Sequence, residues 1–274
     1  MGMITLRRAL AASTVVALAI ALIVLLPALG GSASAPRTPP RFATWQYQLD
    51  GRVIPSAAAQ VWDVDGADTP KRVVTQLRKR GAYTVCYFSA GTYERWRSDR
   101  GRFPRSALGK PNGWPGERWL DIRRVSALAP IMRSRIAACH AKGFDAVEAD
   151  NVDGYSNDTG FAISARDQLR YNRWLARAAH RRGLAIGLKN DLEQARALAG
   201  GFEFAVVEEC IERSECGMTR PFSQRGKAVF DVEYGVSRAQ ACSEGRSAGL
   251  NVLVQTVDLD RPGAPCASGG GGGG

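Results

Sequence analysis

The feature that most constrains the fold of this chain is the alternation of short apolar runs with amphipathic segments. Eight runs rich in apolar and β-branched residues predict strands at 43–48, 60–64, 83–88, 144–149, 184–188, 203–208, 227–232 and 250–257. Amphipathic stretches predict helices at 70–80, 125–142, 165–182, 192–199 and 238–247. Strands and helices that alternate in this way are typical of parallel sheets whose strands are joined by crossover helices.

Three of the expected helices share the same ending. Each finishes on a basic residue that is followed by Gly81, Gly143 or Gly183. A cation is favoured near the negative end of the helix dipole, and glycine accepts the left-handed conformation that closes many helices. The sequence therefore predicts where these helices stop.

Eight strands alternating with helices predict an α/β fold, a single-domain (β/α)8 TIM-type barrel that closes without a free edge. Residues 49–59 are too few for a full crossover helix, so the first crossover is expected to be short. Residues 91–121 are expected to form a long loop after the third strand. The competing fold, a doubly wound open sheet, would carry a glycine-rich phosphate loop, and the sequence contains neither a G-x-G-x-x-G nor a Walker pattern.

The two ends of the chain differ in composition from the expected barrel at 42–266. The apolar stretch 9–29 follows two arginines, and Ala33 and Ala35 provide a small-residue cleavage pattern, which indicates an export signal peptide within residues 1–35. The length of the apolar stretch leaves an uncleaved membrane anchor as the alternative. Both predict a secreted protein or one on the extracellular face of a membrane. A Pro-rich spacer at 36–41 and a glycine-rich tail at 267–274 flank the barrel.

Six cysteines in an exported chain indicate disulfides, because oxidising compartments keep cysteines paired. Several pairings are possible. The short spacing between Cys210 and Cys216 favours a bond that braces the loop after Glu208. Cys242 could tie the last helix to Cys266 in the tail, which leaves Cys86 with Cys139. A zinc site is the competing interpretation, but the sequence contains no C-x-x-C pair.

The formal net charge of +11 raises the question of nucleic acid as a partner. The lysines and arginines are scattered over the expected helix faces, and no basic run is interleaved with aromatic residues. We therefore expect a solvated basic surface and no nucleic-acid binding.

Acidic residues, in contrast, concentrate at the ends of the expected strands, where TIM-type barrels place their reacting groups. Fourteen of the 26 acids lie there: Asp63, Asp65, Asp68, Glu94, Glu148, Asp150, Asp153, Asp191, Glu208, Glu209, Asp231, Glu233, Asp258 and Asp260. A single acid at a strand end is most often a loop cap. The set as a whole predicts an acidic functional rim.

Asp150 and Glu208 are the strongest catalytic candidates. They end the fourth and sixth expected strands, so they should face each other across the barrel mouth. Hydrolysis of a glycosidic bond needs two such carboxyl groups, one to protonate the leaving oxygen and one to attack or to activate water. Apolar strand residues and the neighbouring Glu209 are expected to raise the pKa of Glu208, which favours Glu208 as the acid.

Other chemistries have little support in the sequence. It contains neither a G-x-S-x-G elbow nor an H-E-x-x-H motif, and both histidines lie near expected helix ends. The stretch 150–154 resembles a calcium loop, but the first ligand position is occupied by Ala149. We therefore expect neither a metal ion nor another cofactor.

Several motifs together resemble glycoside hydrolase family 114, the endo-α-1,4-polygalactosaminidases and related barrels. They are Trp45-Gln46-Tyr47-Gln48-Leu49, Asp63-Val64-Asp65, Cys86-Tyr87-Phe88-Ser89-Ala90-Gly91 with Tyr93-Glu94, Trp119-Leu120-Asp121-Ile122, Glu148-Ala149-Asp150-Asn151-Val152-Asp153-Gly154-Tyr155, Leu188-Lys189-Asn190-Asp191, Val207-Glu208-Glu209-Cys210 and Glu233-Tyr234. The match runs in order from about Phe42 to Asp258. One departure is Gly66-Ala67, where the family pattern leads us to expect bulkier apolar residues.

The resemblance implies a TIM-type barrel, a partly deacetylated galactosamine polymer as substrate, Asp150 and Glu208 as catalytic acids, and no cofactor. Within the matching motifs we expect sugar contacts from Trp45, Asp63, Asp65, Tyr87, Ser89, Glu94, Asp153, Tyr155, Lys189, Asn190, Glu233 and Tyr234.

The function expected from the sequence is therefore that of an exported, monomeric endo-glycosidase acting on a cationic galactosamine-containing polysaccharide. A barrel that binds polysaccharide without cutting it, or a component of cell-wall or exopolysaccharide remodelling, is the alternative. A fold-level analogy alone does not prove a substrate.

Overall fold

The computed structural model describes residues 35–55 and 58–267 of the chain. Their main feature is a nine-stranded sheet with the order β1-β2-β3-β7-β8-β9-β10-β11-β12. The strands are β1 (Trp45–Gln48), β2 (Val61–Asp65), β3 (Tyr83–Ser89), β7 (Ala146–Asp150), β8 (Ala185–Lys189), β9 (Phe204–Glu208), β10 (Val229–Glu233), β11 (Asn251–Val254) and β12 (Ala264–Pro265). The first eight are parallel, and β12 adds antiparallel to β11. These eight parallel strands are the eight predicted from the sequence.

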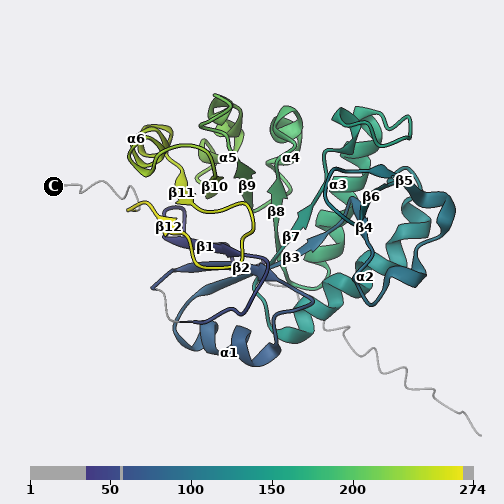
Figure 1. Ribbon diagram of the computed structural model, residues 1–274, viewed down its shortest axis with the longest axis horizontal. Coiled ribbons are helices and arrows are strands. Elements are labelled where there is room, and N and C mark those ends of the chain that lie inside the picture. Colours follow the sequence, from purple (N-terminus) through teal and green to yellow (C-terminus); the bar gives the residue numbers. More distant parts are fainter. Residues whose placement is uncertain (1–34, 56–57, 268–274) are drawn as a thin grey trace, which may run out of the picture. The chain divides into compact units, whose positions relative to one another are not determined.

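Helices cover the outer face of the curved sheet (Figure 1). They are α1 (Lys71–Lys79), α2 (Val125–Lys142), α3 (Ala165–His180), α4 (Ala195–Leu198), α5 (Arg220–Ser223) and α6 (Arg238–Ala248). Short 3-10 turns occur at Arg100–Arg102, Arg105–Ala107, Gly154–Ser156, Leu192–Gln194 and Cys216–Thr219. The described residues of the first crossover, from β1 to β2, form no helix, which agrees with the prediction of a short crossover. Gly81, Gly143 and Gly183 all have positive φ angles, which confirms the predicted helix ends.

The sheet is nearly closed into a barrel, and side chains bridge the gap between β1 and the segment after β11. The side-chain amide of Gln46 donates to the carbonyl of Gly263 (3.2 Å) and accepts from its N–H (2.8 Å). Gln48 donates to the carbonyl of Asp260 at 3.1 Å. These amides satisfy backbone groups that a regular strand pair would otherwise satisfy.

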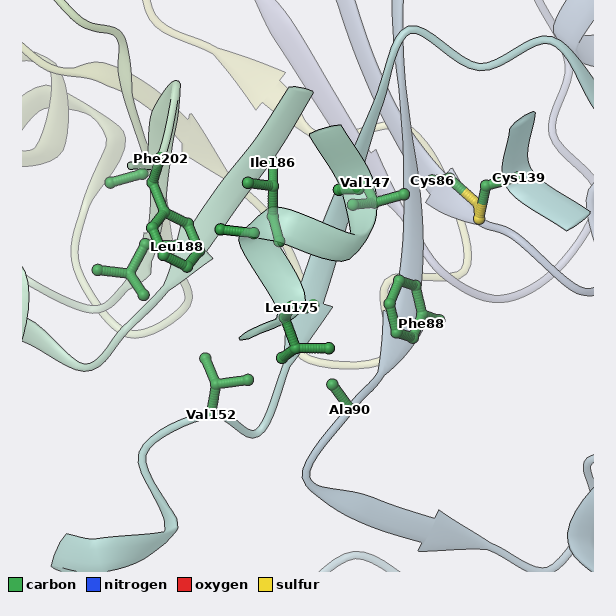
Figure 2. Close-up of a cluster of buried hydrophobic side chains, with 14 of the residues drawn as sticks. Cys86, Phe88, Ala90, Cys139, Val147, Val152, Leu175, Ile186, Leu188 and Phe202 are labelled. Atoms are coloured by element: carbon green, nitrogen blue, oxygen red, sulfur yellow. A yellow bond between two sulfur atoms is a disulfide. The ribbon is translucent and has the colours of Figure 1, made fainter. Parts of the chain in front are cut away.

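Two separate apolar cores follow from the alternation of side chains along each strand. One fills the barrel interior and includes Trp45, Phe204 and Phe230. The other lies between the sheet and the helices. Figure 2 shows part of this outer core, where Val147 of β7 and Ile186 of β8 gather with Leu175 of α3. A sheet buried on both faces in this way is rigid, so its strand ends can hold side chains in fixed positions.

The long loop predicted after β3, the excursion 91–121, carries secondary structure of its own. It contains a second, antiparallel sheet with the order β4-β6-β5, formed by β4 (Thr92–Glu94), β5 (Leu108–Pro111) and β6 (Glu117–Leu120). These strands are short, and they carry glycine, proline and charged residues, so they give no periodic apolar signal. Stability here comes from pairing and burial against the barrel instead of from local propensity.

Three disulfides join Cys86 to Cys139, Cys210 to Cys216 and Cys242 to Cys266. The first connects β3 to α2 and is part of the outer core (Figure 2). It also explains the small residue at position 66. A Cβ atom on Gly66 would lie 2.9 Å from the carbonyl oxygen of Tyr87 and would collide with the sulfur of Cys86.

The expected signal peptide or membrane anchor lies outside the described residues, apart from Ala35. Most of the expected glycine-rich tail, residues 268–274, lies outside them as well. Within the described part of the chain, no helix is long and apolar enough to cross a membrane.

Candidate active site

The candidate site is built by three neighbouring strands, β7, β8 and β9. Side chains alternate along each strand, so that Ala146, Ala185 and Phe204 point into the barrel. An even number of residues further on, the last residues of the three strands are Asp150, Lys189 and Glu208. The same periodicity turns all three toward the barrel axis at the carboxyl end of the sheet, where the sequence analysis placed the catalytic carboxyls.

Lys189 lies at the centre of this arrangement. Its ammonium nitrogen is 3.3 Å from Asp150 Oδ1, 3.2 Å from Glu208 Oε2 and 3.3 Å from Glu148 Oε1. The side chain is almost fully buried. Burial alone would lower the pKa of Lys189, but the three carboxylates outweigh this effect and raise it, so the ammonium stays charged. Lys189 therefore offsets the repulsion between the two candidate catalytic groups.

The carboxylate of Asp150 is held by donors on both oxygens. The backbone N–H of Asn151 donates to Oδ1 at 2.7 Å, and Lys189 contacts the same oxygen. The hydroxyl of Tyr87 (2.8 Å) and the side-chain amide of Asn151 (3.0 Å) donate to Oδ2. Such a set of donors fixes the orientation of the carboxylate.

Glu208 is the more exposed of the two carboxylates, at 29% of its side chain against 16% for Asp150. The Tyr234 hydroxyl donates to its Oε1 at 2.6 Å. Burial would raise the pKa of Glu208, but Lys189 and Tyr234 together lower it below the usual value. The expectation of a raised pKa is wrong, because the sequence did not reveal a cation between the strands, and because Glu209 turns away to pair with Arg213.

The chain bends sharply after Asp150, Lys189 and Glu208, the last residues of the three strands. Asn151, Asn190 and Glu209 have φ angles of 59°, 48° and 58°. Residues other than glycine adopt this left-handed conformation at some cost, and such positions cluster at functional sites. Here the bend directs the N–H of Asn151 back to the carboxylate of Asp150.

A second layer of polar side chains lies beneath the site, inside the barrel. The Tyr47 hydroxyl accepts from Lys189 (2.9 Å) and donates to Glu148 (3.1 Å). Asp63 is 1% exposed, and burial together with the adjacent Glu148 raises its pKa well above the usual value. A protonated Asp63 can share its proton with Glu148, so this layer supports Lys189 from below.

The site opens into a cavity of about 540 Å³, a size typical of ligand pockets, which run from roughly 300 to 1,000 Å³. Eight carboxyl side chains line it: Asp50, Asp65, Asp68, Glu94, Glu117, Asp150, Glu208 and Asp258. Among its described lining residues, only Arg97 and Lys189 are cationic. The cavity is therefore acidic although the whole chain is basic, and it suits a cationic ligand.

The structure brings most of the predicted sugar-contacting residues to this cavity or next to it. Asp65, Tyr87, Glu94, Lys189 and Tyr234 line it. Asn190 does not line the cavity, but its side-chain amide donates to Glu208 at 3.4 Å. Ser89 is fully buried and accepts from the side-chain amide of Asn151. Asp153 and Tyr155 lie on the loop after β7 and do not line the cavity.

Three other predicted contacts are not at the cavity. Trp45 packs on Phe230 in the barrel core, with ring centroids 5.2 Å apart, because it lies one inward position below Tyr47. Asp63 lies in the buried layer beneath the site. Glu233 follows the alternation to the outer face of β10, where it accepts from the backbone N–H of Ile211 at 2.8 Å.

Glu233 and the disulfide between Cys210 and Cys216 hold the same loop, which follows β9. Cys210 also donates its N–H to Asp231, at 3.4 Å. Asp231 and Glu233 lie outside the cavity, so part of the predicted acidic rim has a structural role. The braced loop begins one residue after Glu208.

Residues of the excursion 91–121 also line the cavity, and the sequence analysis did not single them out. They are Trp96, Arg97, Asn112, Trp114 and Glu117. Two tryptophans in a polar segment were the available signal, because a tryptophan outside any periodic apolar pattern has no obvious core position.

Comparisons with known proteins identify the family of the chain. The family model of glycoside-hydrolase family GH114 matches residues 27–270. The crystal structure of Aspergillus fumigatus Ega3 in complex with galactosamine is similar at 33% identity and a TM-score of 0.81, covering 85% of this chain and 98% of that one. The glycoside hydrolase domain of PelA from Pseudomonas aeruginosa has the same fold, at 15% identity and a TM-score of 0.66, covering 82% and 99%.

Among curated proteins, none matches the sequence. The family match nevertheless extends over most of the chain and includes every strand of the barrel. Together with the similarity to Ega3, it confirms the resemblance inferred from the motifs. The chain belongs to glycoside-hydrolase family GH114.

Proposed function

We propose that this protein is an exported endo-glycosidase that hydrolyses an α-1,4-linked, galactosamine-containing polysaccharide with Asp150 and Glu208 as its catalytic carboxyls. The observation that carries the proposal is the pairing of these two carboxylates, through Lys189, at the floor of a cavity lined by eight acids. Ega3, which is similar over nearly its whole length, was crystallised with galactosamine. An acidic cavity complements the ammonium groups of such a polymer.

The contacts of Lys189 favour retention of the anomeric configuration. Asp150 Oδ1 and Glu208 Oε2 lie 3.3 Å and 3.2 Å from the same nitrogen, so these oxygens cannot be farther apart than both distances together. Carboxyl groups about 5 Å apart are typical of retaining enzymes, whereas inverting enzymes need roughly 6.5–9.5 Å to admit a water molecule. The upper limit on this oxygen–oxygen distance therefore covers the retaining range and reaches only the lower end of the inverting range.

The hydrogen bonds of the two carboxylates suggest their roles. Asp150 accepts from four donors, which hold both of its carboxylate oxygens in a fixed orientation, as a nucleophile requires. Glu208 is the more exposed of the two carboxylates and lines the cavity, so we assign it proton transfer to the leaving oxygen. Lys189 holds Glu208 ionised in the free protein, so bound substrate must weaken that contact before Glu208 carries a proton.

Export is supported by the three disulfides, since disulfides persist in oxidising compartments. The chain itself supplies the barrel and the cavity, and the proposal needs neither a second protein nor a cofactor.

A polymer panel tests the proposed function. Galactosamine and glucosamine polymers, each deacetylated or fully N-acetylated, are incubated with the protein, and the products are identified by mass spectrometry. We expect internal cleavage of the deacetylated galactosamine polymer first, with a preference that shrinks as salt is added. NMR of the freshly released reducing end should show the α anomer. No cleavage of any polymer, together with measurable binding, would favour a binding-only barrel.

A further inference from the structure

Two carboxyl side chains face each other across the small sheet of the excursion 91–121. Glu94 of β4 is paired in register with Glu117 of β6. Like charges at directly opposed positions destabilise a sheet unless each is balanced. Glu94 is balanced by Arg97 (2.8 Å) and Arg135 (3.0 Å). Within the described chain, no cation forms an ion pair with Glu117.

Glu117 is only 8% exposed, and yet it lines the cavity. Both hydrogen bonds that reach its carboxyl go to one oxygen, Oε2: Thr92 donates at 2.8 Å and Asn112 at 2.8 Å. No hydrogen bond from the described residues reaches Oε1. A buried carboxylate normally has a cationic partner, because burial of an unpaired charge is costly. The geometry of Glu117 is therefore that of a carboxylate whose partner comes from outside the chain.

Two exposed tryptophans line the same cavity as Glu117. Trp96 is 46% exposed and Trp114 is 50% exposed, and both line it. Val257, another of the few large exposed apolar side chains, lines it too. Large apolar side chains that gather around one polar cavity are typical of a ligand-binding surface. A sugar ring has apolar C–H faces that can pack on an aromatic ring while its polar substituents reach a carboxylate.

Asn112 ties the charged and aromatic parts of this surface together. Its side-chain oxygen accepts from the backbone N–H of Trp114 (3.0 Å), and its amide nitrogen donates to Glu117. One side chain therefore fixes the turn between β5 and β6, in which Trp114 lies and after which β6 begins with Glu117. A surface fixed in this way loses little entropy when a ligand binds.

A chain of hydrogen bonds connects Glu117 to the proposed nucleophile. Thr92 donates to Glu117 and shares a short hydrogen bond of 2.5 Å with Ser89. The Asn151 side-chain amide donates to Ser89 at 3.1 Å and to Asp150 at 3.0 Å. Glu117 is thus separated from Asp150 by three polar side chains, so a sugar bound at Glu117 lies close to the one undergoing cleavage.

We propose that Glu117, Trp96 and Trp114 form a subsite for an amino sugar beside the catalytic carboxyls, and that Glu117 selects the free ammonium over the N-acetylated amine. The inference rests on the proposed function and adds to it the residue that recognises the amine. An ammonium at Oε1 would supply the cation that Glu117 lacks. An N-acetyl group carries no charge and would leave the carboxylate unpaired at a desolvated position, which is unfavourable.

Binding measurements test this without depending on hydrolysis. Asp150→Asn serves as the parent, and isothermal titration calorimetry compares galactosamine oligomers of one length that are either deacetylated or fully N-acetylated. Glu117→Gln keeps an acceptor for Thr92 and Asn112 and removes only the charge. We expect it to weaken binding of the deacetylated oligomer about tenfold and to change binding of the N-acetylated one less than about twofold.

Two further variants make the result specific. Trp114→Ala should weaken binding of both oligomers equally, because packing on an indole does not depend on the amine charge. Glu244→Gln, on α6 and outside the cavity, should change neither affinity. With Asp150 restored, Glu117→Gln should raise KM for the deacetylated polymer and leave kcat near the wild-type value.

An unchanged affinity ratio in Glu117→Gln overturns the inference, even if the protein cleaves galactosamine polymers as proposed. Conversely, a ratio that collapses in Glu117→Gln supports the inference even if no polymer is cleaved, and then the proposed hydrolysis is wrong. If the parent binds neither oligomer, both are overturned.

Discussion

The ends of β7, β8 and β9, here called the catalytic wall, and the excursion 91–121 face the same cavity but balance their charges differently. In the catalytic wall, Lys189 contacts both Asp150 and Glu208, so the chain itself supplies a cation to both carboxylates. In the excursion, Glu117 is buried without an ion pair from the described residues. The first region is preorganised before any ligand arrives, and the second is completed by the ligand.

The two regions also differ in how firmly the surrounding structure holds their side chains. The catalytic wall rises from strands buried on both faces, and its reacting groups are held by a second polar layer at Tyr47 and Glu148. Such support is what precise positioning of reacting groups requires. The excursion is a small sheet on the side of the barrel in which Trp96 and Trp114 remain exposed. The rate of hydrolysis and the selectivity for the free amine should therefore depend on different parts of this fold and be separable by mutation.

The largest expected effect is in the catalytic wall. Asp150→Asn and Glu208→Gln keep the shape of each side chain and remove the charge needed for attack or proton transfer. Each should lower kcat by about 10² to 10⁴ or more. Hydrolysis rates and thermal melting curves check this together. Near-normal activity of either variant, with an unchanged melting temperature, would contradict the proposed pair.

Lys189→Met tests whether the ammonium of Lys189 balances the carboxylates of the catalytic wall. Removal of the ammonium leaves Glu148, Asp150 and Glu208 close together without a counter-ion, which should cost about 3–5 kcal/mol of stability. Denaturant unfolding measures this loss. Because Lys189 lowers the pKa of Glu208, the variant should also move the basic limb of the kcat/KM profile to higher pH.

The double variant Lys189→Met with Glu148→Gln is the control, since it removes one carboxylate along with the cation. It should recover part of the lost stability and keep the shifted pH profile. A profile that does not move in either variant would show that Lys189 has only a structural role.

The sequence predicted the catalytic wall much better than the excursion. Strand-end position is a local pattern, and it placed Asp150 and Glu208 at the barrel mouth, whereas Lys189 was named only through the family resemblance. The pattern could not show that Lys189 lies between two carboxylates, because that contact joins three strands. The raised pKa expected for Glu208 failed for this reason. The sugar contacts expected from Trp45 and Glu233 were misplaced, because the sequence indicates their strand positions but not the depth and face of their side chains.

The excursion carries almost no periodic signal. Its three strands are three or four residues long, and its most informative residues, Trp114 and Glu117, flank a Pro-Gly turn that reads as an ordinary loop. Glu117 became a candidate binding residue only because the register places it opposite Glu94 and because it forms no ion pair in the described structure. Register between short antiparallel strands is set by tertiary packing, so it lay beyond a single sequence.

The smallest expected effect is on the pH dependence of the free energy of unfolding, which reports whether the Glu117 carboxyl is charged. Burial, with Glu94 and Asp150 nearby, raises the pKa of Glu117 to about 7, whereas the pKa of Glu208 is lowered. A carboxyl with a raised folded-state pKa binds its proton more tightly in the folded protein, so its contribution to stability is greatest at acidic pH and is lost as pH rises through about 7. Glu117→Gln has no such loss, and its free energy of unfolding relative to wild type should increase between about pH 5 and 8, by on the order of 1 kcal/mol. Glu244→Gln should track the wild type across this range, and denaturant unfolding of all three proteins at several pH values makes the comparison. A difference between Glu117→Gln and wild type that stays constant with pH would mean that Glu117 is ionised and already balanced, and the contrast between the two regions would fail.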